Sequence, residues 1–172
     1  YIRNLSIFVM DSLNDLRVFK YGNTSQSDLE KITGSFTESL LLLEKYSLDD
    51  DVTDAGWNNT IIQYFEALET RISFSTLGDT RAFAQECLKL FSTPGLAESP
   101  FAQKYRKTAA RSATIHLNNY IAHLIDQQQY QKAYTEAEQG ISIFKNELAF
   151  YDTEVMTSVE RNKSSVKRAL QQ

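Results

Sequence analysis

Residues 130–170 read YQKAYTEAEQGISIFKNELAFYDTEVMTSVERNKSSVKRAL and set the fold class of this chain. Apolar side chains recur every three or four positions, with no proline and a single glycine, Gly140. This spacing is typical of one buried face of a helix, and at about 1.5 Å of rise per residue the helix would be about 60 Å long. We therefore predict a long last helix, whose apolar face is formed by Tyr130, Ala133, Ala137, Ile141, Phe144, Leu148, Tyr151, Val155, Val159, Val166 and Leu170.

The N-terminal end of the chain follows the same spacing. Apolar residues recur at helical intervals from Ile2 onward, and no capping residue precedes them. At the other end, the pattern still runs where the sequence stops at Gln172. We expect a long first helix from Tyr1 to about Tyr21, and we expect residues 1–172 to be a fragment of a larger protein whose helices continue past both ends.

Composition favours a helical fold. The 172 residues are 42% hydrophobic, with six glycines and two prolines, and turn dipeptides do not recur at the short spacing of a β-sandwich or barrel. Both prolines lie in residues 93–100, the strongest break in the chain. We predict an all-α fold: an elongated antiparallel bundle of about six helices, as a single domain or as two sub-bundles divided near residues 93–100.

Capping and turn residues indicate the helices between the first and the last. Ser25 or Ser27 is suited to cap one helix, the acidic run 49–54 precedes another, and Ser99 followed by Pro100 begins a third. Connections this short favour antiparallel neighbours. The expected helices cover, in order, about 25–46, 54–77, 80–92 and 100–126.

Charge and hydropathy exclude two classes of binding. A net charge of −4 and a pI of 5.2 give a field that repels phosphate groups, so nucleic acid is not an expected partner. No apolar run approaches the roughly 18 residues of a membrane span, so any anchor of the parent protein lies outside this segment. The single cysteine, Cys87, lies in an apolar helical pattern that predicts a buried, inert thiol. Lack of disulfides leaves both cytoplasm and periplasm open.

Candidate metal and catalytic motifs fail on spacing. The acidic run 49–54 has Asp54 and Thr60 where an EF-hand loop needs glycine and a bidentate glutamate. His116 and His123 share a helix face but lie about 10 Å apart along it, too far to chelate one metal. Gly-rich phosphate loops, nucleophile elbows and zinc-protease motifs are missing. We expect no metal, no cofactor and no enzymatic activity.

The first half of the chain resembles a family of sensors. Residues 11–21 read DSLNDLRVFKY, and after a polar turn an amphipathic helix ends in LLLEKY at 41–46. A Leu–Arg pair late in the first helix, followed by a tyrosine and a polar turn, resembles the helical extracytoplasmic sensor domains of bacterial chemoreceptors and histidine kinases. In that family the first and last helices continue into membrane spans. The resemblance implies that Arg17 meets a ligand carboxylate, joined by Tyr64 or Arg71; the alternative for Arg17 is a surface or interhelical ion pair.

A second resemblance is local. Residues 129–137 read QYQKAYTEA and, within 129–141, look like the start of the second helix of a tetratricopeptide repeat, with a tyrosine three positions before a small alanine. No second copy appears at a period near 34 residues, so a regular array is not expected. Small residues at Ala133, Ala137 and Gly140 favour close helix contact. As a protein-binding scaffold, the chain would offer three aromatic contacts: Tyr105, Tyr120 and Tyr134.

Two functions are consistent with these patterns. The first is a non-catalytic sensing domain of a bacterial signal-transduction receptor, in the periplasmic or extracytoplasmic part of an inner-membrane protein. It would bind a small ligand or a partner protein and transmit a shift between the first and last helices. The second is a cytoplasmic, tetratricopeptide-like scaffold for protein–protein interaction. Apolar residues beyond one face of the first helix also predict a homodimer through that helix.

Overall fold

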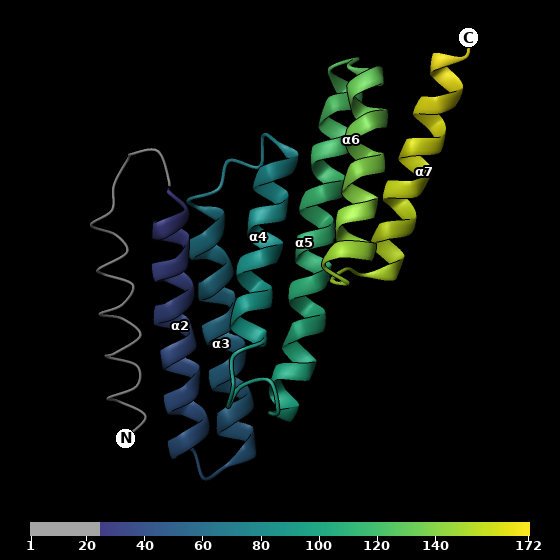
Figure 1. Ribbon diagram of the computed structural model, residues 1–172. Coiled ribbons are helices and arrows are strands. Elements are labelled where there is room, and N and C mark those ends of the chain that lie inside the picture. The colour runs from purple at the N-terminus through teal and green to yellow at the C-terminus, as the bar shows by residue number, and fades with distance from the viewer. Residues whose placement is uncertain (1–24) are drawn as a thin grey trace. The chain divides into compact units, whose positions relative to one another are not determined.

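The computed structural model describes residues 25–172, and these residues fold as helices without strands (Figure 1). The all-α prediction is confirmed. The predicted first helix, residues 1–21, lies outside the described residues. The elements are α2 (Gln26–Tyr46), α3 (Asp50–Glu69), α4 (Leu77–Phe91), α5 (Pro100–Asp126), α6 (Tyr130–Ser142), the π-helical segment η1 (Ile143–Glu147) and α7 (Thr153–Leu170).

Side-chain caps fix the starts of these helices. Ser25 caps α2 in a reciprocal capping box with Asp28, and Asp49 caps α3 by accepting from the Asp51 and Val52 amides. The Ser99 hydroxyl accepts from the Phe101 amide at 3.3 Å and so caps α5. These starts agree with the predicted ones to within a few residues, because a cap is a local signal that the sequence carries by itself.

The predicted single helix over 130–170 is wrong. The helix ends at Ser142, passes through η1, and turns back to α7, with Ala149 at a positive φ of 46°. Phe150 is fully buried, and its amide donates to the Phe144 carbonyl at 3.0 Å. Asp152 then caps α7 by accepting from the Val155 amide. Apolar spacing continued across this turn because α6 and α7 each bury one face, so periodicity could not reveal the break.

The connection between α3 and α4 is also longer than predicted. α3 ends at Glu69 and α4 begins at Leu77, three residues before the predicted start. A capping box marks that start: the Asp79 amide donates to the Thr76 hydroxyl, and the Thr76 amide donates to the Asp79 carboxylate.

Contacts divide the described residues into two compact units. Unit 1 comprises residues 25–72 and 86–106, and unit 2 comprises residues 73–85 and 107–172. α4 and α5 each contribute residues to both units, and the proline-bearing segment 93–100 lies within unit 1. No helix among residues 25–172 is both long and apolar enough to cross a bilayer.

Unit 1 is built on the α2–α3 hairpin, whose helices run antiparallel (Figure 1). The Trp57 ring is fully buried in unit 1 and stacks on the Tyr105 ring, with ring centroids 6.1 Å apart. Trp57 also stacks on the Phe91 ring, with ring centroids 6.4 Å apart. The Trp57 indole N–H donates to Glu44 at 2.6 Å, which satisfies the ring's one polar group.

Unit 2 is built on the α6–α7 hairpin, and small residues of α6 let α4 and α5 approach this helix closely. Ala133, Ala137 and Gly140 are buried along one face of α6. A Cβ placed on Gly140 would lie 2.6 Å from Leu117 and 3.3 Å from Leu77. The predicted close contact is present at Gly140, and Ala133 and Ala137 are buried on the same face.

Candidate functional site

Unit 2 carries an open hollow of about 360 Å³, which we call the first hollow. Three helices and the start of η1 surround it, so its shape depends on the packing of the whole unit. Its walls combine apolar groups with charged and hydrogen-bonding ones, a mixture typical of binding sites. The lining residues are Thr76, Leu77, Gly78, Arg81, Tyr120, Lys132, Glu136, Gln139 and Ile143.

Two polar groups of the first hollow are held by neighbours. The Tyr120 hydroxyl donates to Glu136 at 3.2 Å, and burial of the ring, together with the Glu136 charge, raises the pKa of Tyr120 to about 12. Tyr120 therefore stays a protonated donor across the physiological range. The Arg81 guanidinium pairs with Glu147 at 2.8 Å, and both side chains are at least 40% exposed. This ion pair is accessible, so it contributes little stability and can be exchanged for another anion.

Lys132 is a charged group of this hollow without a partner among residues 25–172. Its side chain is exposed, and it makes no hydrogen bond or ion pair with any of residues 25–172. Glu136 also lines the hollow but accepts from Tyr120, and an ammonium group that makes no ion pair is available to an incoming anion. Lys132, Arg81 and the Gln139 amide thus offer several donors around one opening.

A second hollow of about 320 Å³ also belongs to unit 2 and lies along α6 and α7. Lys163 lies over the Tyr134 ring, 5.3 Å from its centroid, and pairs with Glu138 at 2.9 Å. Glu160 pairs with Lys145 at 3.0 Å, whereas Lys167 has no ion-pair partner in the described part of the chain. The lining residues are Tyr134, Ile141, Glu160, Lys163, Ser164 and Lys167.

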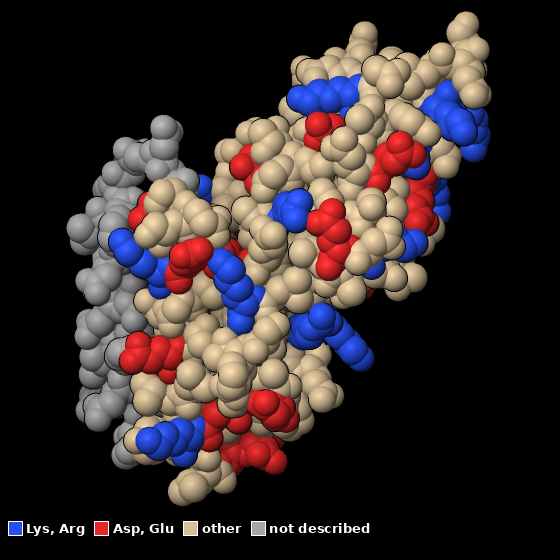
Figure 2. Space-filling view, viewed as in Figure 1, with Lys and Arg blue, Asp and Glu red and all other residues tan. Residues whose placement is uncertain are grey.

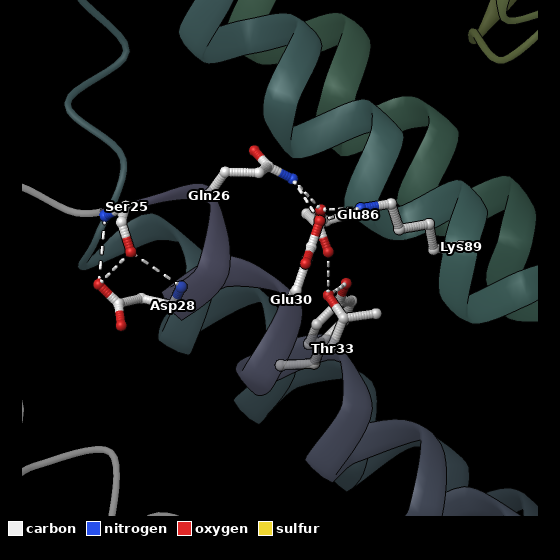
Figure 3. Close-up of polar contacts among 8 residues, drawn as sticks. Ser25, Gln26, Asp28, Glu30, Thr33, Glu86 and Lys89 are labelled. Carbon is white, nitrogen blue, oxygen red and sulfur yellow. Dashed lines mark hydrogen bonds and ion pairs between the residues drawn. The ribbon is translucent and has the colours of Figure 1, made fainter.

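Unit 1 contains a buried carboxylate, Glu86, held by three donors from two helices (Figure 3). Gln26 and Lys89 donate to its Oε1 atom at 2.8 and 2.7 Å, and the Thr33 hydroxyl donates to its Oε2 atom at 2.6 Å. Because the Thr33 proton is used in this way, the Tyr64 hydroxyl donates to Thr33 at 2.8 Å. No buried side-chain atom of the cluster lacks a hydrogen-bond partner, so the cluster holds α2, α3 and α4 together.

The sensor-like ligand set is only partly described. Tyr64 is fully buried and bound to Thr33, and burial raises its pKa well above the ordinary value. Arg71 is half-buried just after the end of α3. Arg17 lies outside the described residues. A ligand role for these three residues stays a prediction, and contact with Tyr64 would require the Thr33 hydrogen bond to open.

The three tyrosines proposed as partner contacts have different environments. Tyr105 is buried against Trp57, and its hydroxyl donates to Asp54 at 2.7 Å. Tyr120 lines the first hollow, and Tyr134 lines the second. Sequence reasoning missed Lys132 and Arg81, because nothing in their local spacing indicates which cation is left without a partner.

Two further side chains of reactive types, His116 and Cys87, are packed against their neighbours. His116 stacks on Phe74 with centroids 3.8 Å apart. Cys87 is buried as predicted, and burial raises the pKa of its thiol well above the ordinary value, which keeps it unreactive. Among residues 25–172, no group of three His, Cys, Asp or Glu side chains is placed to hold a metal ion.

Comparison with known proteins does not assign the chain to a family. No family model matches this chain, and no curated protein or solved structure matches it.

Proposed function

We propose that this chain is a non-catalytic sensing domain that binds a small carboxylate-bearing ligand in the first hollow of unit 2. The observation that carries the proposal is Lys132, a cation without a partner among residues 25–172, on a wall that also holds Arg81 and Gln139. The Glu136 carboxylate of the same wall is occupied by the Tyr120 hydroxyl. A carboxylate accepts from several donors at once, and hydrogen bonds to charged groups are the stronger ones. The apolar Leu77 and Ile143 would contact the carbon skeleton of the ligand.

The first hollow is linked to the turn between α6 and α7. Ile143 lines the hollow and begins η1, and Glu147, the partner of Arg81, ends it. π-Helical turns are often found at functional sites. A ligand carboxylate that pairs with Arg81 would release Glu147. The ligand-bound state would then favour a different conformation of the turn that leads to α7. Such exchange is a way to transmit binding as a helix shift.

The parent protein follows from the same proposal. A sensing domain of this kind would serve a bacterial signal-transduction receptor, as the extracytoplasmic part of an inner-membrane protein. A cytoplasmic receptor is the alternative, since the carboxylate site does not depend on the compartment.

A thermal-shift screen against amino acids and di- and tricarboxylic acids tests this function. A ligand that binds only the folded state raises the melting temperature with its concentration. Lys132→Gln should abolish the shift without lowering the melting temperature of the free protein, because Lys132 has no partner to lose among the described residues. Lys107→Gln, at an exposed lysine of α5, is the matched control and should leave the shift intact.

Two results would count against the sensor. One is silence across the whole panel from a folded protein. The other is a shift that Lys132→Gln leaves unchanged.

The second candidate function, a helical scaffold for a partner protein, is favoured by the close α6 packing at Ala133, Ala137 and Gly140. Peptides selected from a random displayed library would then bind with an affinity that Tyr134→Ala lowers and Lys132→Gln does not. Loss of binding on substitution of Lys132 in the first hollow therefore indicates the sensor, and loss on substitution of Tyr134 in the second hollow indicates the scaffold.

A further inference from the structure

The connection between α2 and α3 in unit 1 exposes three large apolar side chains, Tyr46, Leu48 and Val52. Leu48 has 103% of its reference surface exposed, against 42% for Tyr46 and 38% for Val52 on either side. Isolated exposed apolar residues are common. Three within seven residues at one hairpin connection form a cluster, which we call the hairpin tip (residues 46–52).

Hydrogen bonds hold the hairpin tip in one conformation. The Ser47 amide donates to the Leu43 carbonyl at 3.0 Å, and the Thr53 hydroxyl donates to the Asp49 carbonyl at 2.8 Å. The Asp49 carboxylate in turn accepts from the Asp51 amide at 2.9 Å. Leu48 is therefore displayed by an ordered connection, and a preorganised contact group loses little conformational entropy on binding.

The hairpin tip is also acidic. Asp50 and Asp51 are exposed, and neither carboxylate has an ion-pair partner among the described residues. Figure 2 shows acidic side chains gathered at this end of the α2–α3 hairpin. A surface that fits the tip must offer an apolar recess with cations at its rim.

The second hollow of unit 2 has that chemistry. Tyr134 and Ile141 supply apolar walls, Lys167 supplies a cation without an ion-pair partner in the described part of the chain, and Lys163 supplies a second cation, which also pairs with Glu138. Its single acid, Glu160, is already paired with Lys145. A volume of about 320 Å³ leaves room for the four-carbon side chain of Leu48. Basic side chains gather on the C-terminal half of α7 in Figure 2.

We propose that the hairpin tip of one copy of this chain binds the second hollow of another copy, with Leu48 inserted between Tyr134 and Ile141 and with Asp50 and Asp51 facing Lys163 and Lys167. The two surfaces differ, so the contact is heterologous and repeats head to tail. A contact confined to one helix connection and one hollow belongs with weak, transient associations. It uses the second hollow, so it does not depend on the ligand site proposed for the first.

Sedimentation velocity over a concentration series tests this association. The wild-type chain should show a weight-average sedimentation coefficient that rises with concentration and falls back at high salt. Leu48→Ser should weaken association about tenfold or more, as truncating a central contact does. Its matched control is Ile62→Ser, at a similarly apolar exposed site on α3, 49% exposed, which should associate as the wild type does.

Charge variants identify the partner surface. Lys167→Glu should weaken association to the same extent, whereas Lys107→Glu at the exposed lysine of α5 should not. Neither lysine has an ion-pair partner in residues 25–172, so both variants should fold normally, which circular dichroism checks.

Mixing provides the sharpest test. Leu48→Ser chains keep an intact second hollow, and Lys167→Glu chains keep an intact hairpin tip. An equimolar mixture should therefore form a one-to-one complex that neither variant forms alone and that cannot extend further. A wild-type chain that is monomeric at all concentrations, association that survives Leu48→Ser, or a mixture that stays monomeric would each overturn the proposal.

Discussion

The Thr33 hydroxyl of α2 donates to the buried Glu86 carboxylate of α4 across 2.6 Å, while it accepts from Tyr64 of α3. One hydroxyl thus joins three helices of unit 1 through two hydrogen bonds. Both side chains are buried, since Glu86 is fully buried and Thr33 is 5% exposed. A buried polar group left without its partner costs more than the hydrogen bond contributes when made.

Thr33→Val should therefore destabilise unit 1 strongly. Valine keeps the shape of threonine but leaves the Tyr64 hydroxyl and one Glu86 oxygen without a partner, at a cost of about 1–3 kcal/mol. Thr33→Ser keeps the hydroxyl and should cost less, because it removes only a methyl group. Chemical denaturation of both variants measures the difference. Equal losses for Val and Ser would mean that the hydroxyl contributes nothing.

Two glycines in helices should respond to substitution with opposite signs. A Cβ on Gly34 of α2 meets no atom within 4 Å, so Gly34→Ala should stabilise by about 0.5–1 kcal/mol through helix propensity. Gly140→Val should destabilise by about 1–3 kcal/mol, because its Cβ would approach Leu117 to 2.6 Å in a packed interior. Thermal unfolding measures both, and stabilisation by Gly140→Val would contradict the close packing of α6.

Ala149 gives a direct test of the turn between α6 and α7. Its φ of 46° is unfavourable for alanine and accessible to glycine, so Ala149→Gly should stabilise by about 0.5–1 kcal/mol. In an unbroken helix the same change would destabilise by about 1 kcal/mol. The sign of the change in unfolding free energy therefore decides between the turn and the single long helix that periodicity predicts.

Asp79 should make unit 2 sensitive to acid. Partial burial raises the pKa of its carboxyl, but hydrogen bonds from the Ser73 and Thr76 side chains and from the Thr76 and Ser75 amides outweigh burial and lower the pKa below its ordinary value. A lowered pKa adds stability above the ordinary value, and that stability is lost as the pH falls through the folded-state value. Asp79→Asn should flatten the fall in stability below about pH 4.

Denaturation midpoints of the wild type and Asp79→Asn, measured from neutral pH down to about pH 3, check this expectation. The Asp79→Asn substitution is also expected to lower stability at neutral pH, because an amide oxygen near the start of α4 interacts less favourably with the helix dipole than a charged carboxylate does. An acid limb that is identical in both proteins would assign the acid sensitivity to other carboxyls.

Helix starts could be predicted because each rests on a few adjacent residues. Ser25, Asp49 and Ser99 cap the helices that the sequence indicates, and the buried faces of α2, α3 and α5 follow their apolar spacing. The same local reasoning missed Asp152 as a cap, because it lay inside a longer apolar pattern that two helices share.

The candidate site could not be predicted, because it depends on which charges pair. Lys132 and Lys163 are both lysines on helices of unit 2, yet Lys163 pairs with Glu138, 25 positions earlier in the chain, and Lys132 pairs with nothing among residues 25–172. Partners separated by this distance in sequence meet only through tertiary packing.

The sequence by itself determined that this chain is all-α, where most helices begin, and which faces are buried, because helical period, capping and side-chain size act over a few residues. Only the tertiary structure decided that the last predicted helix is a hairpin, that Glu86 is held by residues 53 and 60 positions away, and that Lys132 faces an open hollow. These features arise when distant segments meet in a packed interior, where burial and the pairing of polar groups select one arrangement from many that share the same local pattern.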